Sequence, residues 1–164
     1  HDDFLALYLA VYVLGGNFSA RLMSHVRDDL GLTYGIGAQL AGIAVAHAGH
    51  ALLRVTLSGP NLDRGIEATL AEFRRFVEDG ITADELAEKQ TTIAGTFSVG
   101  LATTRGLATA LLVNAERDFE VGYLAAYPEK IHALSLDEVN AAIRRHLDPD
   151  ALHIGIAGTL PDAG

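Results

Sequence analysis

The stretch over residues 14–37 constrains this chain most, because glycines divide it into a turn, a short helix and a strand. Gly15 and Gly16 open the stretch and free the backbone to turn where a side chain would clash. Ser19 is a typical N-cap for the helix that follows, and Gly31 is a typical residue to end one. The chain therefore reverses at Gly31, so a helix residue and a strand residue on either side of it can face the same cleft.

Two segments of this stretch carry a resemblance to a known protein family. They read GGNFSARL over residues 15–22 and VRDDLGLTYG over residues 26–35. Together they resemble the second-type, non-zinc-binding domain of the pitrilysin/insulinase zinc peptidases, the family that includes mitochondrial processing peptidase. Other segments fit the same resemblance, and they are residues 2–3, 80–82, 135–139 and the terminal strand that ends at Gly158.

Composition excludes several other classes of protein. At 164 residues the chain is long enough for one domain with a real core, and 49% of it is apolar. The net charge of −9 argues against a nucleic-acid-binding surface. The chain has no cysteine, so it has neither disulfides nor a thiolate metal site. Its N-terminal apolar run, residues 4–14, is too short to cross a bilayer, and we expect no membrane span.

Hydrophobic spacing predicts the fold class. Alternating residues predict two strands, over residues 33–40 and 52–58, and a final strand that contains Leu152, Ile154 and Ile156. Helices lie before, between and after these strands, and this order is typical of an α+β fold with helices on one side of a mainly antiparallel sheet. The resemblance implies a processing-peptidase-like metallohydrolase fold, truncated at its N-terminal side, with further strands before His1 and an exposed sheet edge. We therefore expect residues 1–164 to form a single, partial domain.

Local signals predict where the helices begin and end. The run over residues 4–14 is apolar nearly all round, which is typical of a buried helix. Amphipathic spacing predicts a helix over residues 62–77 that Gly80 closes. Capping-box patterns predict the starts of two later helices, at Thr82 with Glu85 and at Ser135 with Glu138. Pro128 is expected to kink or restart the helix between residues 121 and 134.

The zinc-binding motif of the family, H-x-x-E-H, does not occur in this chain. The nearest approach is His47-Ala48-Gly49-His50, which lacks the glutamate base and lies in the expected strand connection. We interpret these histidines as solvated loop residues that can bind metal only adventitiously. We therefore expect neither a catalytic nor a metal-binding residue in this chain, and we expect the chain to be inactive alone.

Arg27 and Tyr34 are the candidate substrate-binding residues. The resemblance implies this role, because in the family the non-zinc-binding domain supplies an arginine and a tyrosine, seven residues apart, that reach the substrate beside the zinc. A guanidinium and a phenol are donors that can stabilise charge on a tetrahedral intermediate. Two alternatives remain open: Arg27 can simply contact Asp28 or the helix C-terminus, and Tyr34 can be a core residue.

The glycine loop supplies a second candidate. Gly15, Gly16 and Asn17 resemble a short form of the glycine-rich loop in the non-catalytic subunit of the processing peptidase, which implies substrate binding. A plain turn is the alternative. Gly35 and Gly37 are open to two interpretations as well, because they allow either an extended peptide or a helix to approach the strand closely.

Taken together, the resemblance predicts the substrate-holding, non-zinc-binding domain of a zinc metalloendopeptidase that hydrolyses peptides in a closed chamber. It implies a partner domain or subunit that binds zinc, and an unfolded peptide as substrate. The alternative is a non-catalytic scaffold or peptide-binding subunit of the same family. The compartment stays open, with the bacterial cytoplasm and periplasm as the candidates.

Overall fold

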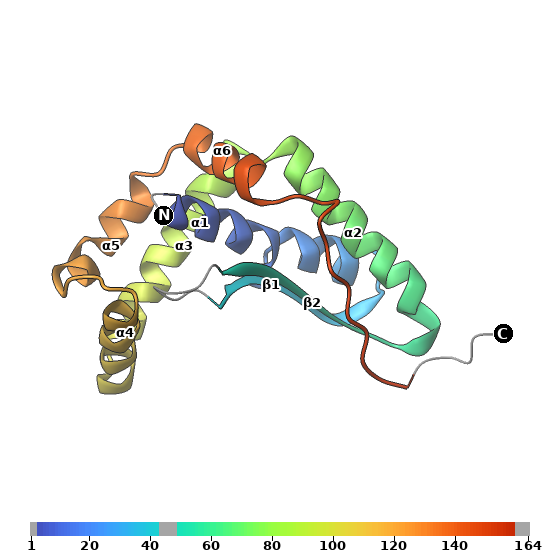
Figure 1. Cartoon of the computed structure of the whole chain (residues 1–164), viewed down its shortest axis with the longest axis horizontal. Helices are drawn as coiled ribbons and strands as arrows, with labels where there is room; N and C mark the ends of the chain where they lie inside the picture. The colour runs from blue at the N-terminus through green and yellow to red at the C-terminus, as the bar shows by residue number, and fades with distance from the viewer. Residues whose placement is uncertain (1–2, 43–48, 160–164) are drawn as a thin grey trace.

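The computed structural model describes residues 3–42 and 49–159, and Figure 1 shows helices packed over one side of a small sheet. The helices of the first half are α1 (Phe4–Gly15), the π-helix η1 (Met23–Asp29) and the 3₁₀ turn η2 (Gly59–Asn61). The strands are β1 (Thr33–Ala41) and β2 (His50–Leu57). The helices of the second half are α2 (Leu62–Asp79), α3 (Ala83–Leu101), α4 (Thr104–Glu116), α5 (Gly122–His132) and α6 (Leu136–His146).

The sheet is an antiparallel pair of strands, β1 with β2, and the helices α1, α2 and α6 lie on one side of it (Figure 1). Ile36 pairs with Val55 and Ala38 with Leu53, so apolar side chains share the face toward the core. The predicted α+β fold with helices on one side of an antiparallel sheet is therefore confirmed. Within the described residues, each strand has hydrogen-bonded partners along one edge only.

The predicted final strand is wrong. Residues 151–159 contain no strand, and Leu152, Ile154 and Ile156 are exposed. Alternating apolar residues indicate only which side chains would share a face if a strand formed. A strand also needs a neighbouring strand that pairs with its backbone N–H and C=O groups. No described strand pairs with this segment.

Most predicted helix ends are confirmed. Gly80 follows α2 with φ +71°, a conformation that glycine adopts without a steric cost. Both capping boxes form, with Thr82 and Ser135 as the N-caps of α3 and α6.

Pro128 does not restart its helix, because α5 continues through it from Gly122 to His132. The absent proline N–H costs one hydrogen bond, and packing of α5 against α3 outweighs that loss.

The core is built around α1, which contacts β1, α3 and α6. Leu9 and Leu14 of this helix are fully buried, together with Phe76 of α2 and Ile143 of α6. Burial of each such side chain stabilises the fold by about 1.5–3 kcal/mol. This confirms the prediction of a helix buried nearly all round.

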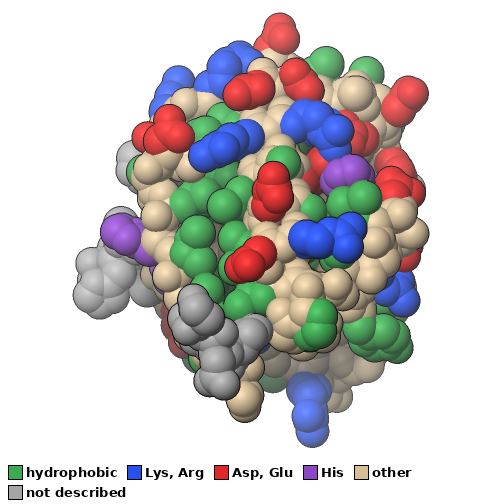
Figure 2. Space-filling view, turned by 90° about the vertical axis from the view of Figure 1, so that its right-hand side faces the viewer, with side chains coloured by type: hydrophobic (Ala, Val, Ile, Leu, Met, Phe, Trp, Pro, Cys, Tyr) green, Lys and Arg blue, Asp and Glu red, His purple; other side chains and the backbone are tan. Residues whose placement is uncertain are grey.

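The surface carries both signs of charge. On the face seen in Figure 2, acidic and basic side chains are interspersed, with apolar side chains between them. Among the described residues, no single helix is both long and apolar enough to cross a membrane; α3 and α4 meet both conditions only as a pair, which is bent by 113°.

Candidate functional site

The helix η1 places Arg27 in its last turn, as predicted. Val26, the residue before Arg27, is fully buried and anchors this turn in the core. The turn is wider than an α-helical one, because the Leu30 amide donates to the His25 carbonyl over 3.1 Å, five residues back. Gly31 then reverses the chain with φ +63°, which confirms its predicted role.

Tyr34 lies at an irregularity in the sheet. Thr33 pairs with Leu57, and Gly35 pairs with Thr56, the neighbour of Leu57 in β2. Tyr34 is therefore an extra residue in β1. The Thr33 hydroxyl holds this bulge: it donates to the Thr56 carbonyl over 2.6 Å and accepts from the Gly35 amide over 3.1 Å. Bulges re-aim side chains at the edges of functional sites, and here the bulge leaves Tyr34 87% exposed.

The structure brings Arg27 and Tyr34 together. The guanidinium carbon of Arg27 lies 5.4 Å from the centroid of the Tyr34 ring, which is cation–π distance. The Arg27 side chain is 32% exposed, and its Nη1 also lies 3.4 Å from Oδ1 of Asp28. Tyr34 is therefore not a core residue, while the contact of Arg27 with Asp28 is real but long. Most donors of the guanidinium, and the phenol, remain open to a ligand.

Gly15 and Gly16 line a different feature, a cavity of about 650 Å³ between α1 and the two strands. Gly35 and Gly37 line it as well, across from Thr56 and Arg54 of β2. Arg27 and Tyr34 are not among its lining residues, although Gly35 directly follows Tyr34.

Close packing explains both glycines of the first predicted pair and one of the second, since a β-carbon on Gly16 would lie 2.4 Å from Cδ2 of Tyr12. A β-carbon on Gly15 would lie 2.3 Å from the Ala38 nitrogen, and one on Gly37 would lie 3.1 Å from the Gly15 carbonyl oxygen. Helix α1 and strand β1 thus meet backbone to backbone at this point. A β-carbon on Gly35 would meet nothing within 4 Å, so space beside that residue is open. Neither Gly15 nor Gly16 has a positive φ, so packing space, rather than backbone freedom, is what Gly15 supplies.

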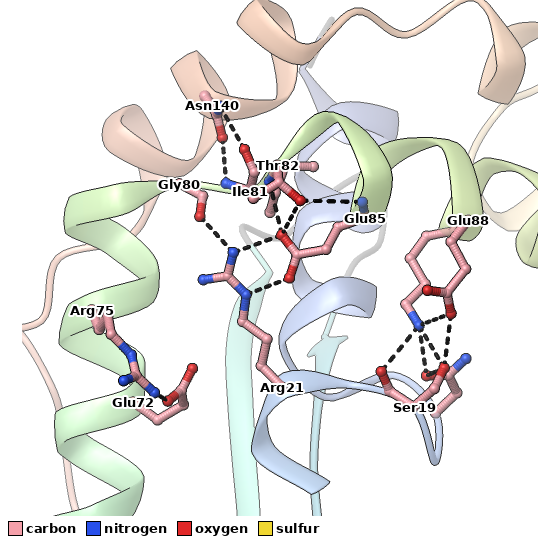
Figure 3. A network of polar contacts seen from close by, with 12 residues as sticks. Ser19, Arg21, Glu72, Arg75, Gly80, Ile81, Thr82, Glu85, Glu88 and Asn140 are labelled. Carbon is pink, nitrogen blue, oxygen red and sulfur yellow. Dashed lines mark hydrogen bonds and ion pairs between the residues drawn. The ribbon is translucent and has the colours of Figure 1, made fainter. Parts of the chain in front are cut away.

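Asn17 and Ser19 are held by a buried lysine from α3, and Figure 3 shows Ser19 beside Glu88 of that helix. The Lys89 side chain is 2% exposed, and its ammonium donates to Ser19 Oγ over 2.7 Å and to Asn17 Oδ1 over 3.4 Å. It also donates to Glu88 Oε1 over 2.8 Å. The prediction of Ser19 as an N-cap is therefore wrong, because its hydroxyl is engaged by Lys89 and Glu88. A buried ammonium needs such acceptors. Two of them, Ser19 and Asn17, lie 70 and 72 residues away in the sequence.

Arg21 is a residue that the sequence reasoning missed. Its Nε donates to Glu85 Oε1 over 2.6 Å, and its Nη2 donates to Glu85 Oε2 over 2.7 Å and to the Gly80 carbonyl over 2.9 Å (Figure 3). Glu85 is also the capping-box residue of α3, so this bidentate pair ties the glycine stretch to the start of that helix. The capping box was visible in the sequence, but no local signal links positions 21 and 85.

Acidification is expected to weaken this contact. Burial alone raises the pKa of Glu85, but the Arg21 guanidinium and the Thr82 amide outweigh burial and hold that pKa below its ordinary value. Because the folded state has the lower pKa, the stabilisation is fully present above the unfolded pKa of Glu85. It is lost as the pH falls through the folded pKa.

Urea unfolding between about pH 7 and pH 3 measures this effect. The wild-type chain should lose more free energy of unfolding over the acidic part of that range than Glu85→Gln, which has no carboxylate to protonate. Equal losses in the two proteins would contradict the assignment.

The predicted metal assignment concerns residues that are only partly described. His47 lies outside the described residues, and His50 is the first residue of β2. Within residues 3–42 and 49–159, no group of three or more His, Asp or Glu side chains is arranged to hold a metal ion.

Comparison with known proteins supports the resemblance. A family model described as the peptidase M16 inactive domain matches residues 1–93. An uncharacterized zinc protease, YmxG of Bacillus subtilis strain 168, is 26% identical over 158 residues, which are 92% of this chain and 36% of that protein. A non-peptidase homolog, YmxG of Helicobacter pylori, is 24% identical over 94% of this chain and 35% of its own length. The chain thus spans about a third of these curated relatives.

A solved structure shows the same fold. The crystal structure of a peptidase M16 inactive domain from Pseudomonas fluorescens matches with a TM-score of 0.81 and 24% identity. The match covers 92% of this chain and 35% of that one. The topology described above is therefore that of the inactive domain.

Proposed function

Because the chain belongs to the peptidase M16 inactive-domain family, as its resemblance predicted, we propose that it holds the peptide substrate of a zinc metallopeptidase. In this proposal a zinc-bearing domain or subunit of the same family faces it across a closed chamber. The partner's zinc supplies the activated water, and this chain supplies donors for the peptide. The observation that carries the proposal is the convergence of Arg27 and Tyr34 at 5.4 Å, with the phenol exposed.

The chemistry of the pair suits an extended peptide. A guanidinium offers several donors in a fixed plane, and its cation–π contact with Tyr34 does not consume those donors. The phenol adds one donor at the position that the bulge gives it. Two donors aimed at one carbonyl oxygen would stabilise the negative charge that grows there during hydrolysis.

Mutation of the pair in an assembly that contains the zinc-bearing partner tests the proposal. Arg27→Ala and Tyr34→Phe should each lower peptide turnover by roughly tenfold to a hundredfold, with zinc content unchanged. Arg74→Ala is the matched control, because Arg74 is an exposed arginine of α2. Wild-type turnover in both site variants would rule out the assigned role.

A scaffold or peptide-binding role without hydrolysis is the second candidate. The name of the Helicobacter pylori relative, a non-peptidase homolog, favours it. The sequence of the partner distinguishes the two roles. An H-x-x-E-H motif in the domain or subunit that faces this chain supports hydrolysis, and the absence of that motif there supports the scaffold role.

A further inference from the structure

A second cavity lies among α1, α3, α4 and α5. Its volume is about 170 Å³. Most of its lining is aromatic, and the rings belong to Phe4, Tyr8, Phe97, Phe119, Tyr123 and Tyr127. Since the chain has 6 Phe, 5 Tyr and no Trp, more than half of its aromatic residues surround this one space.

The rings are ordered against one another rather than scattered. Phe119 and Tyr123 stack with centroids 4.2 Å apart and an interplanar angle of 19°. Phe97 and Tyr127 lie 4.3 Å apart at a tilt of 37°. A space of this size suits one six-membered ring, because a dry cavity of about 150 Å³ holds benzene. A ligand ring would meet aromatic side chains from three helices and from the turn before α5.

A cation lines the same cavity. The guanidinium carbon of Arg117 lies 5.0 Å from the Phe4 ring centroid, and Arg117 is one of the lining residues. Nearby, the Lys130 ammonium lies 5.6 Å from the Tyr123 ring centroid. Within residues 3–42 and 49–159, neither side chain has a carboxylate at ion-pair distance. Arg117 therefore brings a positive charge to the cavity wall that no described carboxylate neutralises at ion-pair distance.

The polar groups inside the cavity do not oppose an anion. Burial raises the pKa of Tyr8 and, further, that of Tyr127, so both phenols stay protonated at neutral pH. They therefore bring hydroxyl groups and no negative charge to the cavity wall.

We propose that this cavity binds a small aromatic monocarboxylate, with its ring among the aromatic side chains and its carboxylate on Arg117. A planar guanidinium matches a carboxylate with two parallel hydrogen bonds, so Arg117 supplies specificity for charge and the rings supply specificity for shape. The site is separate from Arg27 and Tyr34 and does not depend on the function proposed for them.

Titration of the 164-residue chain with 3-phenylpropionate tests the proposal. Three of the chain's five tyrosines line the cavity and the chain has no tryptophan, so tyrosine fluorescence reports binding directly. We expect saturable binding with a Kd of roughly 1 mM or lower. Two matched probes separate the contributions: 3-phenylpropionamide keeps the ring without the charge, and propionate keeps the charge without the ring. Each should bind at least about tenfold more weakly.

Variants then locate the site. Arg117→Met should weaken 3-phenylpropionate about tenfold, and Arg117→Lys should retain part of that affinity. Arg105→Met, at an exposed position near the start of α4, is the control and should bind as the wild type does. Ala110→Leu should abolish binding by filling the cavity, and urea unfolding checks that each variant is folded.

Three results would overturn the proposal: no saturable binding to the wild type, equal binding of the acid and the amide, or undiminished binding to both Arg117→Met and Ala110→Leu.

Discussion

Gly15→Ala is expected to lower the free energy of unfolding by about 3 kcal/mol, because the added methyl group has no room. Its β-carbon would lie 2.3 Å from the Ala38 nitrogen, 2.7 Å from the Ala38 β-carbon and 2.8 Å from the Gly37 carbonyl carbon. These atoms are backbone or fixed to it, so no side chain can turn away. The substitution would have to separate α1 from β1, the contact that joins the central helix to the sheet.

Urea unfolding measures this effect, and Gly95→Ala is its matched control. Gly95 lies within α3, and a β-carbon there would meet nothing within 4 Å. That variant should gain about 0.5–1 kcal/mol, because alanine loses less backbone entropy in a helix. If Gly15→Ala unfolds at the wild-type urea concentration, the close approach of α1 and β1 is not as described.

Arg21→Met is expected to cost a similar amount, about 2–3 kcal/mol. The Arg21 side chain is 19% exposed and that of Glu85 is 24% exposed, so loss of the cation leaves a half-buried carboxylate without its partner. The Gly80 carbonyl loses a donor in the same step, and the Phe76 ring loses a cation 5.5 Å from its centroid.

A double-mutant cycle that combines Arg21→Met with Glu85→Gln measures the interaction free energy between the two side chains. Glutamine keeps the capping box of α3, so the cycle reports the contact with Arg21 and not the loss of a cap. Arg145→Met is the control, because its ion pair with Asp3 is exposed and should contribute little to the free energy of unfolding. Additive effects of Arg21→Met and Glu85→Gln would show that the two side chains do not interact.

Several features of the fold could be predicted because their causes lie within a few residues. The capping boxes at Thr82 and Ser135 are contacts between neighbours in the chain, and both form. Gly31 and Gly80 have the positive φ values that their places after a helix suggest. The predicted strands over residues 33–40 and 52–58 end within two residues of β1 and β2.

The errors share one cause, which is distance along the chain. Ser19 has the local features of an N-cap, but Lys89 competes for its hydroxyl from 70 residues away. Leu152, Ile154 and Ile156 alternate as a strand does, yet whether a strand forms depends on a neighbour. The bulge at Tyr34 could not be predicted either, because it is a shift in the pairing register between two strands.

The sequence by itself determined the family of this chain, the order of its elements up to α6 and the spacing that allows Arg27 and Tyr34 to meet. These depend on residue types and on chain reversal at Gly31, both of which are local properties. Only the tertiary structure decided that Gly15 is a packing contact, that Arg21 clamps Glu85, and that aromatic rings from four segments enclose a cavity beside Arg117. Those outcomes depend on which distant surfaces come within a few ångströms, and that is set by the packing of the whole core.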